Sequence, residues 1–393
     1  MSGPALRAPW QRTHTCGELR EAHVGREVVL NGWVAARRDH GGIYFVDLRD
    51  RYGLTQVVLS EELAHGVRFS AEWVLAVRGR VVRRDPGNVN AERETGAVEV
   101  AAEHVEVLSP STTPVFEIED DVEASVELRL QKRYLDLRRP KLQRQLVHRS
   151  RFTNAMRRGF EEEGFVEVET PILTKATPEG ARDYLVPSRV HPGHFYALPQ
   201  SPQIFKQILM VAGLDRYFQV ARCFRDEDLR ADRQPEFTQL DMEMSFVQEE
   251  DIFGVWERVL ARCFRETMGF ELAVPFPRLA WSEAMNRFGV DKPDTRFGME
   301  LVDLAPWVPS SGFGVFASAL EAGGRVLAIA VPGGGQAVSR GQMKPLEALA
   351  KDLGAKGLAW WKPSEEGGAA GPLARFCAGA VGEDLLRRLG ATR

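Results

Sequence analysis

The chain contains few cysteines and lacks any long hydrophobic run. Its cysteines, Cys16, Cys223, Cys263 and Cys377, form no CxxC pair and accompany no histidines at a zinc-ligand spacing. No apolar stretch approaches the roughly 18 residues that a membrane-spanning helix needs. The N-terminus also lacks the basic and then apolar segments of a secretion signal. The composition therefore excludes a disulfide framework, a structural zinc site and a membrane span, and we expect a soluble protein of the reducing cytoplasm.

Neither sign of charge is in large excess. The 393 residues include 51 Lys and Arg against 55 Asp and Glu, which gives a formal net charge of -4. A protein that coats nucleic acid without sequence preference is usually strongly basic, so that class is excluded, although a local basic surface is not. The hydrophobic content of 44% and the charged content of 27% are typical of a globular chain with two or three domains.

The N-terminal part of the sequence predicts a small all-β barrel. Short strand-like segments alternate with turns rich in glycine, asparagine and aspartate. The predicted strands span 28–36, 43–50, 55–60, 73–82 and 97–107. Five strands connected in this way favour a closed barrel over an open sheet.

The second predicted strand and its neighbours carry candidate nucleic-acid contacts. Phe45 could stack on an unpaired base, and Arg38 could bind phosphate or a base edge. Gln56 has the paired donor and acceptor that can read a base edge. The alternative for Phe45 is ordinary core packing, because an aromatic residue within a strand is usually buried.

The remaining chain mixes helical and strand-like patterns. Phe152, Met156 and Phe160 recur at four-residue intervals, and residues 252–264 follow the three-four spacing of an amphipathic helix. Strand-like segments lie between these helices, so we expect an α+β domain with an antiparallel sheet. From Pro293 onward the chain becomes rich in glycine. The expected division is 1–110 for the barrel, 111–140 for a hinge, 141–292 for the α+β domain and 293–393 for a partial α+β module.

The segment from Phe218 to Met244 predicts a β-hairpin whose loop is dense in arginines and carboxylates. Arg225 opens this loop and is followed by Asp226 and Glu227. The planar guanidinium fork suits a phosphate or carboxylate, while the acids could orient arginines or hold a hydrated magnesium ion. The alternative is a solvated hairpin tip with surface salt bridges.

A second group of candidates precedes the hairpin. Glu179 lies in a loop with proline and glycine and could bind an ammonium group, although a lone glutamate is usually solvated. Ser201 is expected to cap a helix that has Pro202, Gln203 and Lys206 in its first turn. Since a lysine near a helix N-terminus opposes the helix dipole, Lys206 predicts a nearby acid or anion.

These segments resemble the bacterial aspartyl-tRNA synthetases, which are class II aminoacyl-tRNA synthetases. The matching stretches are 32–42, 45–51, 133–140, 169–189, 195–246 and 291–298. The resemblance implies an OB-fold that binds the anticodon, a hinge, an antiparallel catalytic domain and a bacterial insertion domain. It further implies ATP-dependent ligation of L-aspartate to tRNA(Asp) in the cytoplasm. Pro171 would lie at a homodimer interface.

The resemblance also implies roles for individual residues. Arg225 would be catalytic, Lys206 paired with Asp241 would recognise the aspartate side chain, and Phe237 would stack on adenine. Magnesium would enter with ATP, and no protein metal ligand is assigned. The implied residues are Glu179, Gln203, Lys206, Arg225 and Asp241 for aspartate; Arg225, Asp226, Glu227, Gln234 and Phe237 for ATP; and Arg38, His40, Phe45, Gln56 and Glu99 for the anticodon.

Two departures from the family pattern lead to further expectations. The late glycine-rich segment with an ATP-binding arginine is not found before Arg393. We therefore expect a chain that ends within the insertion domain and is inactive or impaired, with a non-catalytic tRNA-binding fragment as the alternative. His40 stands where members selective for tRNA(Asp) often have leucine, which suggests additional charging of tRNA(Asn). An asparaginyl or lysyl relative is the nearer rival, and segments 177–183 and 200–206 argue against it.

Overall fold

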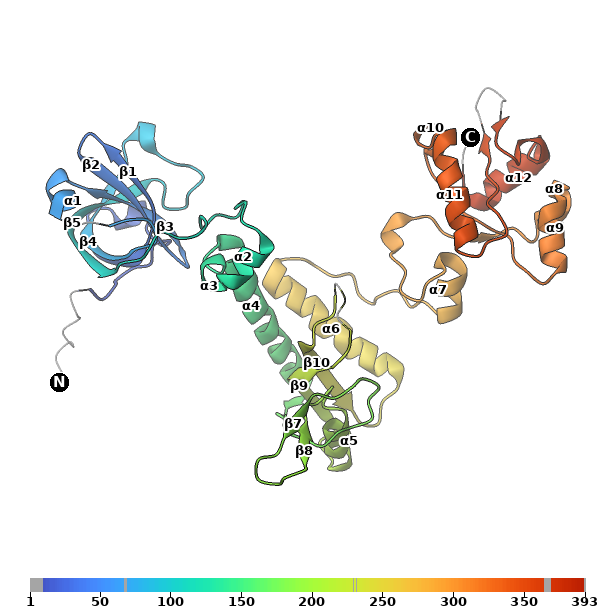
Figure 1. The fold of residues 1–393 in the computed structure, drawn as a ribbon, viewed down its shortest axis with the longest axis horizontal. Coiled ribbons are helices and arrows are strands. Elements are labelled where there is room, and N and C mark those ends of the chain that lie inside the picture. The colour runs from blue at the N-terminus through green and yellow to red at the C-terminus, as the bar shows by residue number, and fades with distance from the viewer. Residues whose placement is uncertain (1–9, 67–68, 229, 231, 364–368, 392–393) are drawn as a thin grey trace. The chain divides into compact units, whose positions relative to one another are not determined.

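The computed structural model describes residues 10–66, 69–228, 230, 232–363 and 369–391. The chain divides into two compact units, Met1–Pro275 and Phe276–Arg393 (Figure 1). The first unit contains the barrel, three helices of the connecting region and the central sheet. No helix in the described part of the chain is long and apolar enough to cross a membrane.

The predicted barrel is confirmed, and it is closed. Its strands follow the order β1-β2-β3-β5-β4, with only β3 and β5 running parallel. Inward residues such as Val28, Leu30, Val46 and Leu48 are completely buried, as expected for alternate positions of a half-buried strand. The barrel strands are β1 (Glu27–His40), β2 (Ile43–Asp50), β3 (Gly53–Leu59), β4 (Val74–Arg83) and β5 (Val98–Ser109), and the short helix α1 (Glu61–Gly66) follows β3.

The connecting region is helical and is organised around a buried carboxylate. Asp136 has no exposed surface, and its Oδ1 accepts a hydrogen bond from Arg139 at 2.8 Å. Arg133 donates to the other carboxylate oxygen, and Arg129 lies 3.9 Å away. The helices are α2 (Val126–Gln131), α3 (Arg133–Asp136) and α4 (Pro140–Glu162). Proline begins α4 because that position needs no backbone donor.

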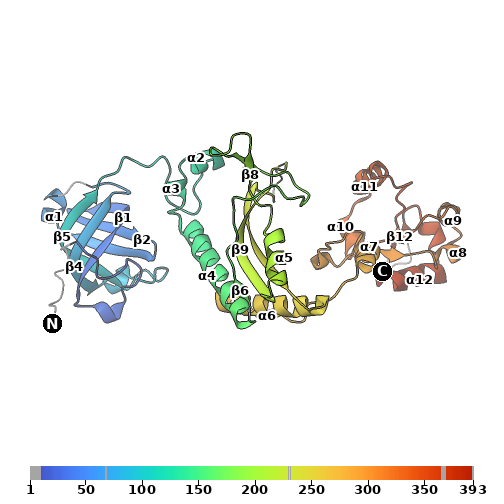
Figure 2. The ribbon, with the colours of Figure 1, turned by 90° about the horizontal axis from the view of Figure 1, so that it is seen from below.

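A three-stranded sheet forms the centre of the α+β part. Strand β9 (Arg216–Phe224) pairs antiparallel with β10 (Glu236–Met244), which confirms the predicted hairpin, and parallel with β6 (Val166–Glu167). Figure 2 shows β9 between α4 and α5 (Gln203–Val211). The short strands β7 (Leu185–Pro187) and β8 (Phe195–Ala197) form a separate pair.

Helices α4 and α6 (Glu249–Met268) cover one face of this sheet. Phe160 of α4 stacks on Phe218 of β9 with ring centroids 5.1 Å apart. Val255 and Val259 of α6 join the same core, together with Met242 of β10. The helical spacing predicted for both segments is confirmed, because their apolar faces meet here.

The second unit is a smaller α+β structure around the completely buried Trp307. Its indole Nε1 donates to the Val381 carbonyl at 3.0 Å. The helices are α7 (Trp281–Phe288), α8 (Val308–Ser311), α9 (Gly314–Glu321), α10 (Gly334–Ala337), α11 (Arg340–Asp352) and α12 (Ala380–Leu389), and the strands are β11 (Val302–Asp303), β12 (Leu327–Ala328), β13 (Lys362–Pro363) and β14 (Ala369–Ala370). The multidomain fold class is thus confirmed, while the proposed four-part division remains a prediction.

Candidate active site and RNA-binding face

Because side chains alternate along a strand, one face of the β9–β10 hairpin is apolar and the other is polar. Leu240 and Met242 belong to the core beneath α4 and α6. Phe237, Asp241 and Glu243 occupy the alternate positions of β10, so they lie on the opposite face. The charged residues therefore share a face because they are spaced by even numbers along a strand.

Arg225 continues this polar face at the end of β9. Its backbone N–H donates to the Pro235 carbonyl at 2.9 Å, which closes the hairpin loop. The guanidinium carbon lies 5.1 Å from the centroid of the Phe237 ring, within cation–π distance. The Nε donor is buried and has no hydrogen-bond partner in the described protein. An unpaired buried donor is costly, so this Nε could donate to an added acceptor.

Lys206 lies over the same strand, in the first half of α5. Its Nζ is 3.0 Å from Asp241 Oδ1 and 3.3 Å from Glu243 Oε2, and 13% of the lysine side chain is exposed. Burial alone would lower the pKa of Lys206, but the two carboxylates outweigh it and raise that pKa. The expectation of an acid beside Lys206 is confirmed. Glu243 was missed in the sequence, although its spacing of two residues from Asp241 was a usable signal.

The loop before β7 is fixed to the start of α5. Ser201 Oγ donates to Glu179 Oε2 at 2.5 Å, and Thr177 donates to the other oxygen at 3.1 Å. The prediction that Ser201 caps α5 is wrong, because Pro202 occupies the cap position and the serine hydroxyl turns to Glu179 instead. Gln203 is the first residue of α5.

A buried glutamine that the sequence did not reveal holds this loop in place. Gln200 is 1% exposed, and its side-chain amide exchanges two hydrogen bonds of 2.9 Å with the backbone of Ala181. Its Nε2 also donates to Asp183. A side chain that satisfies backbone groups in this way replaces regular pairing and fixes the loop without a strand.

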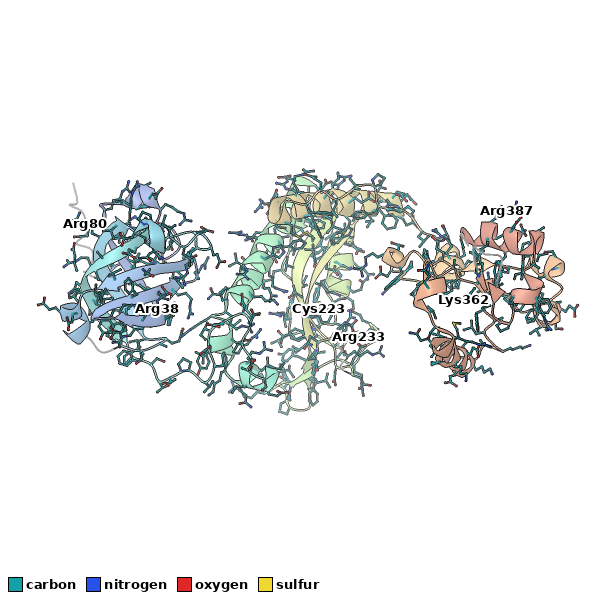
Figure 3. All side chains as sticks on the ribbon, turned by 90° about the horizontal axis from the view of Figure 1, so that it is seen from above. Arg38, Arg80, Cys223, Arg233, Lys362 and Arg387 are labelled. Atoms are coloured by element: carbon teal, nitrogen blue, oxygen red, sulfur yellow. The ribbon has the colours of Figure 1, made fainter. Side chains whose placement is uncertain are left out.

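The hairpin loop borders a cavity of about 370 Å³. Asp226 and Glu227 line it, with the backbone N–H of Asp226 donating to the Arg182 carbonyl at 3.0 Å. Glu227 forms an ion pair of 3.5 Å with Arg233, and Figure 3 shows Arg233 at the hairpin loop and Cys223 within the sheet. Gln234 is exposed on the same loop. The predicted ATP residues therefore extend from the sheet to the cavity rim.

The Cys223 thiol sits amid the candidate residues and is electrically neutral. Burial is the largest influence, and together with Asp241 it raises the pKa of Cys223 to about 11. Arg225 opposes this effect, and Glu179 adds to it. Arg225, Asp241 and Glu179 therefore all influence the pKa of the same buried thiol. A thiol with this pKa is protonated at neutral pH, so it is a poor nucleophile.

No resident metal centre is evident in the described residues. They contain no group of three or more His, Cys, Asp or Glu side chains arranged to hold an ion. A magnesium ion delivered with a nucleotide needs only one or two protein carboxylates, because phosphates and water supply its other ligands. The acids at the cavity rim are compatible with that arrangement.

Pro171 lies on a different cavity of about 570 Å³, which also touches β9 at Gln219. The Gln219 side-chain oxygen accepts hydrogen bonds from Thr170 at 2.9 Å and from Tyr217 at 2.8 Å. Pro171 itself is exposed. Its predicted place at a subunit interface remains a prediction.

The barrel gathers most of its candidate residues into one hydrogen-bonded network. Arg38 donates to both oxygens of Asp47 at 3.1 Å and to Gln56 Oε1 at 3.2 Å. Gln56 Nε2 in turn donates to Glu99 Oε2 at 2.7 Å. Asp47, which the sequence analysis did not select, is only 2% exposed.

Phe45 and His40 lie next to this network. Phe45 is the cross-strand partner of Arg38 and is half-buried. This burial does not decide between base stacking and core packing. The exposed His40 packs against the Phe45 ring in a T-shaped arrangement, with centroids 5.5 Å apart. Because Phe45 is only half-buried, part of its ring is open to solvent.

Two family models match the chain. Residues 125–365 match the model described as tRNA synthetases class II (D, K and N), and residues 28–108 match the OB-fold nucleic acid binding domain. The first match covers more than half of the chain and includes the whole polar face of the β9–β10 hairpin. The second coincides with the closed barrel.

The chain is also similar to curated bacterial proteins. It is 54% identical over 386 residues to the aspartate–tRNA ligase of Bacillus licheniformis, which covers 97% of this chain and 65% of the relative. It is 54% identical over 385 residues to the aspartate–tRNA(Asp/Asn) ligase of Symbiobacterium thermophilum, covering 96% of this chain and 65% of that protein. The chain thus spans about two thirds of the length of these relatives, and its predicted resemblance to bacterial aspartyl-tRNA synthetases is confirmed.

Solved structures share the fold at lower identity. The asparaginyl-tRNA synthetase of Pyrococcus horikoshii, complexed with asparaginyl-adenylate, superposes with a TM-score of 0.62 at 24% identity and covers 72% of this chain and 68% of its own. The asparaginyl-tRNA synthetase of Entamoeba histolytica gives a TM-score of 0.58 at 22% identity, with 68% and 64% covered. These values establish a shared architecture and carry no statement about specificity.

Proposed function

Because the chain belongs to the class II tRNA synthetases of the D, K and N type, we propose that the protein is an aspartate–tRNA ligase. It would activate L-aspartate with ATP and transfer the aspartyl group to tRNA(Asp). The observation that carries this proposal is the Lys206 ammonium, on a side chain that is only 13% exposed, over the same sheet face as the unpaired Arg225 donor. The reported curated relatives are named as ligases, and they lend no support to the alternative of a non-catalytic tRNA-binding protein.

The nucleotide would bind at the hairpin. An adenine on Phe237 and a phosphate on Arg225 can belong to one ATP, since the guanidinium carbon lies 5.1 Å from the ring centroid. Asp226 and Glu227 at the cavity rim would orient the triphosphate and the magnesium ion that accompanies it. The cavity of about 370 Å³ beside them provides volume for phosphate groups.

The amino acid would bind between Lys206 and the loop that carries Glu179. The ammonium of Lys206 would bind the substrate side-chain carboxylate, while the Glu179 carboxylate and Gln203 would contact the amino-acid end. Asparagine would leave the buried lysine with an uncharged amide as its ligand. Such a loss is costly at a desolvated charge, so Lys206 would favour aspartate.

Activation would require no protein nucleophile. An oxygen of the substrate α-carboxylate attacks the α-phosphorus of ATP, the bond to the bridging oxygen breaks, and pyrophosphate leaves with its magnesium. Arg225 would stabilise the charge that develops on the α-phosphoryl oxygens. The terminal 3′-hydroxyl of tRNA then attacks the aspartyl carbonyl, and AMP leaves. The protonated Cys223 is consistent with this scheme, since no covalent enzyme intermediate forms.

Isothermal titration calorimetry tests the proposal directly. We expect a non-hydrolysable aspartyl-adenylate analogue to bind the chain at least tenfold more tightly than the asparaginyl analogue, or about 1.4 kcal/mol. Arg80→Met, on the barrel, is a matched control that should leave both affinities unchanged. Equal affinity for the two analogues, or binding of the anticodon stem-loop alone, would contradict the assignment.

A second acceptor RNA follows from His40. The Symbiobacterium thermophilum relative carries Asp/Asn in its name, and His40 is exposed beside Phe45 on the barrel. We propose that the protein also aspartylates tRNA(Asn). Charging assays with both purified tRNAs test this, and a product with tRNA(Asp) alone would remove tRNA(Asn) from the substrates. Assembly as a homodimer through the Pro171 region is likewise proposed and can be measured by light scattering.

A further inference from the structure

Arg93, which the sequence analysis did not select, completes the network on the RNA-binding face of the barrel. Its Nη1 and Nη2 donate to the two oxygens of Asp47 at 3.1 and 3.2 Å. Arg38 binds the same two oxygens from another strand. One carboxylate that is 2% exposed is therefore shared by two planar guanidinium forks.

The loop that carries Arg93 is held rigidly against the barrel. Thr95 Oγ1 donates to the Leu54 carbonyl at 2.6 Å, and the Asn90 N–H donates to the Gly96 carbonyl at 3.1 Å. A Cβ at Gly96 would lie 1.8 Å from the Asn90 carbonyl oxygen, so only glycine allows this close approach. Arg93 is thus placed by the backbone of a tight loop, and its side chain is pre-organised.

Arg38, which Asp47 holds, and Glu99 together fix the orientation of Gln56. Arg38 Nη2 donates to Gln56 Oε1 at 3.2 Å, which makes that atom the amide oxygen rather than the nitrogen. Gln56 Nε2 donates to Glu99 at 2.7 Å and keeps one hydrogen free. The amide therefore presents one remaining lone pair and one remaining hydrogen in a fixed order.

We propose that Arg93 is a positioning residue for anticodon recognition, acting through Asp47 and Arg38 to fix the amide of Gln56. The recognised group is the edge of an unpaired RNA base that offers a donor beside an acceptor. This inference rests on the proposed function, because it takes the barrel face as the place where the anticodon binds. Without Arg93, Asp47 and Arg38 can rotate, so the amide oxygen loses its fixed donor and only the bond to Glu99 holds the Gln56 side chain.

The test measures discrimination between RNA sequences rather than affinity alone. Fluorescence anisotropy would give the affinity of the 393-residue chain for a tRNA(Asp) anticodon stem-loop and for the same RNA with its middle anticodon base replaced. Arg93→Met should reduce the ratio of the two affinities about tenfold, the lower range of one base contact. Arg93→Lys retains the charge but not the fork, so it should restore overall affinity without restoring the ratio.

Arg80→Met is the matched control. Figure 3 shows Arg80 and Arg38 apart on the barrel, and Arg80 is a partly exposed arginine 4.0 Å from Glu103. The control should lower the affinity for both RNAs equally, if at all, and leave the ratio of the two affinities unchanged. Thermal unfolding of each variant monitors barrel integrity. If Arg93→Met does not fold, the ratio of affinities measured for Arg93→Lys tests the proposal.

A double-mutant cycle identifies the route of the effect. Once Gln56→Ala has removed the amide, Arg93→Met should cause no further loss of discrimination, since the residue acts through that amide. Additive losses would overturn the proposal, as would full discrimination by Arg93→Met or by Arg93→Lys. A wild-type chain that does not distinguish the two RNAs would instead refute the proposed function, and this inference with it.

Discussion

The barrel and the central sheet each hold one charged group between two groups of the opposite sign, and the sign of the central charge differs between them. In the barrel, one buried carboxylate, Asp47, lies between the guanidinium groups of Arg38 and Arg93. On the sheet, one half-buried ammonium, Lys206, lies between the carboxylates of Asp241 and Glu243. In each cluster antiparallel strands supply part of the set, because residues two apart point in the same direction, and one member comes from outside the strands: Arg93 from a loop and Lys206 from α5.

The net charge of the cluster matches the proposed ligand in the barrel but not on the sheet, where the proposed ligands are anions. The barrel cluster has one positive charge beyond its carboxylate, which suits the phosphates of RNA. The sheet cluster has one negative charge beyond its lysine, and the nearby Arg225 supplies the positive charge that balances it. Burial also differs, since 2% of Asp47 but 13% of the Lys206 side chain is exposed. The deeper group should therefore be more sensitive to loss of its charge.

Replacement of Asp47 should have the largest effect on stability. Asp47→Asn removes the buried charge between two arginines and should cost about 2–3 kcal/mol of barrel stability, because the arginine side chains are 42% and 32% exposed and can be rehydrated. For a domain of about 80–100 residues this lowers the Tm by about 8 °C or more, which differential scanning calorimetry would resolve. Asp39→Asn, an exposed site on the same strand as Arg38, is the control and should shift the Tm little. A loss below about 1 kcal/mol would show that solvent screens the barrel cluster.

Replacement of Lys206 should have the next largest effect, on binding rather than folding. Lys206→Met leaves Asp241 and Glu243 facing the substrate carboxylate without a cation. Affinity for the aspartyl-adenylate analogue should fall about a hundredfold, or roughly 2.7 kcal/mol, as measured by calorimetry. ATP affinity, which depends on the hairpin, should remain within about twofold. Undiminished binding of the aspartyl analogue would place substrate recognition elsewhere.

The stability contributed by Lys206 and the stability contributed by Asp136 should be lost at opposite ends of the pH scale. Carboxylates raise the pKa of Lys206 despite burial, so its contribution to stability is complete below the ordinary value of 10.5 and is lost as pH rises through the higher folded value. Burial opposes ionisation of Asp136, yet Arg139 and Arg133 lower its pKa, so that contribution is present above 3.8 and is lost in acid. Calorimetry of wild type, Lys206→Met and Asp136→Asn across pH should show that the first variant loses alkaline sensitivity and the second loses acid sensitivity. Identical profiles for all three proteins would contradict this assignment.

The smallest predicted change concerns His40. His40→Leu removes the polar ring but retains an apolar contact with Phe45, an aromatic interaction normally worth about 0.5–1.5 kcal/mol. Charging of tRNA(Asn) should therefore fall by up to about tenfold, while charging of tRNA(Asp) stays the same. Aminoacylation kinetics with the two purified tRNAs would measure both. An equal decrease for both tRNAs would indicate damage to the barrel rather than a change in specificity.

The barrel and the hairpin were predictable because their information is local. Alternating residues such as Val28 and Leu30 predict a strand with one buried face, and turn residues mark its ends. The same period explains why Asp241 and Phe237 share one face of the hairpin, which the structure shows and the sequence analysis did not state. The Ser201 cap failed because a serine hydroxyl can bond either to its own helix or to a carboxylate brought near by tertiary folding, here Glu179.

The sequence by itself determined the strand periodicity, the family and the types of charged group at each candidate site. Only the tertiary structure decided that Arg93 shares Asp47 with Arg38, that Glu243 joins Asp241 on Lys206, and that Gln200 fixes the loop of Ala181. The reason is physical. A strand's period follows from backbone geometry, whereas the partner of a buried charge depends on which distant segments exclude water together.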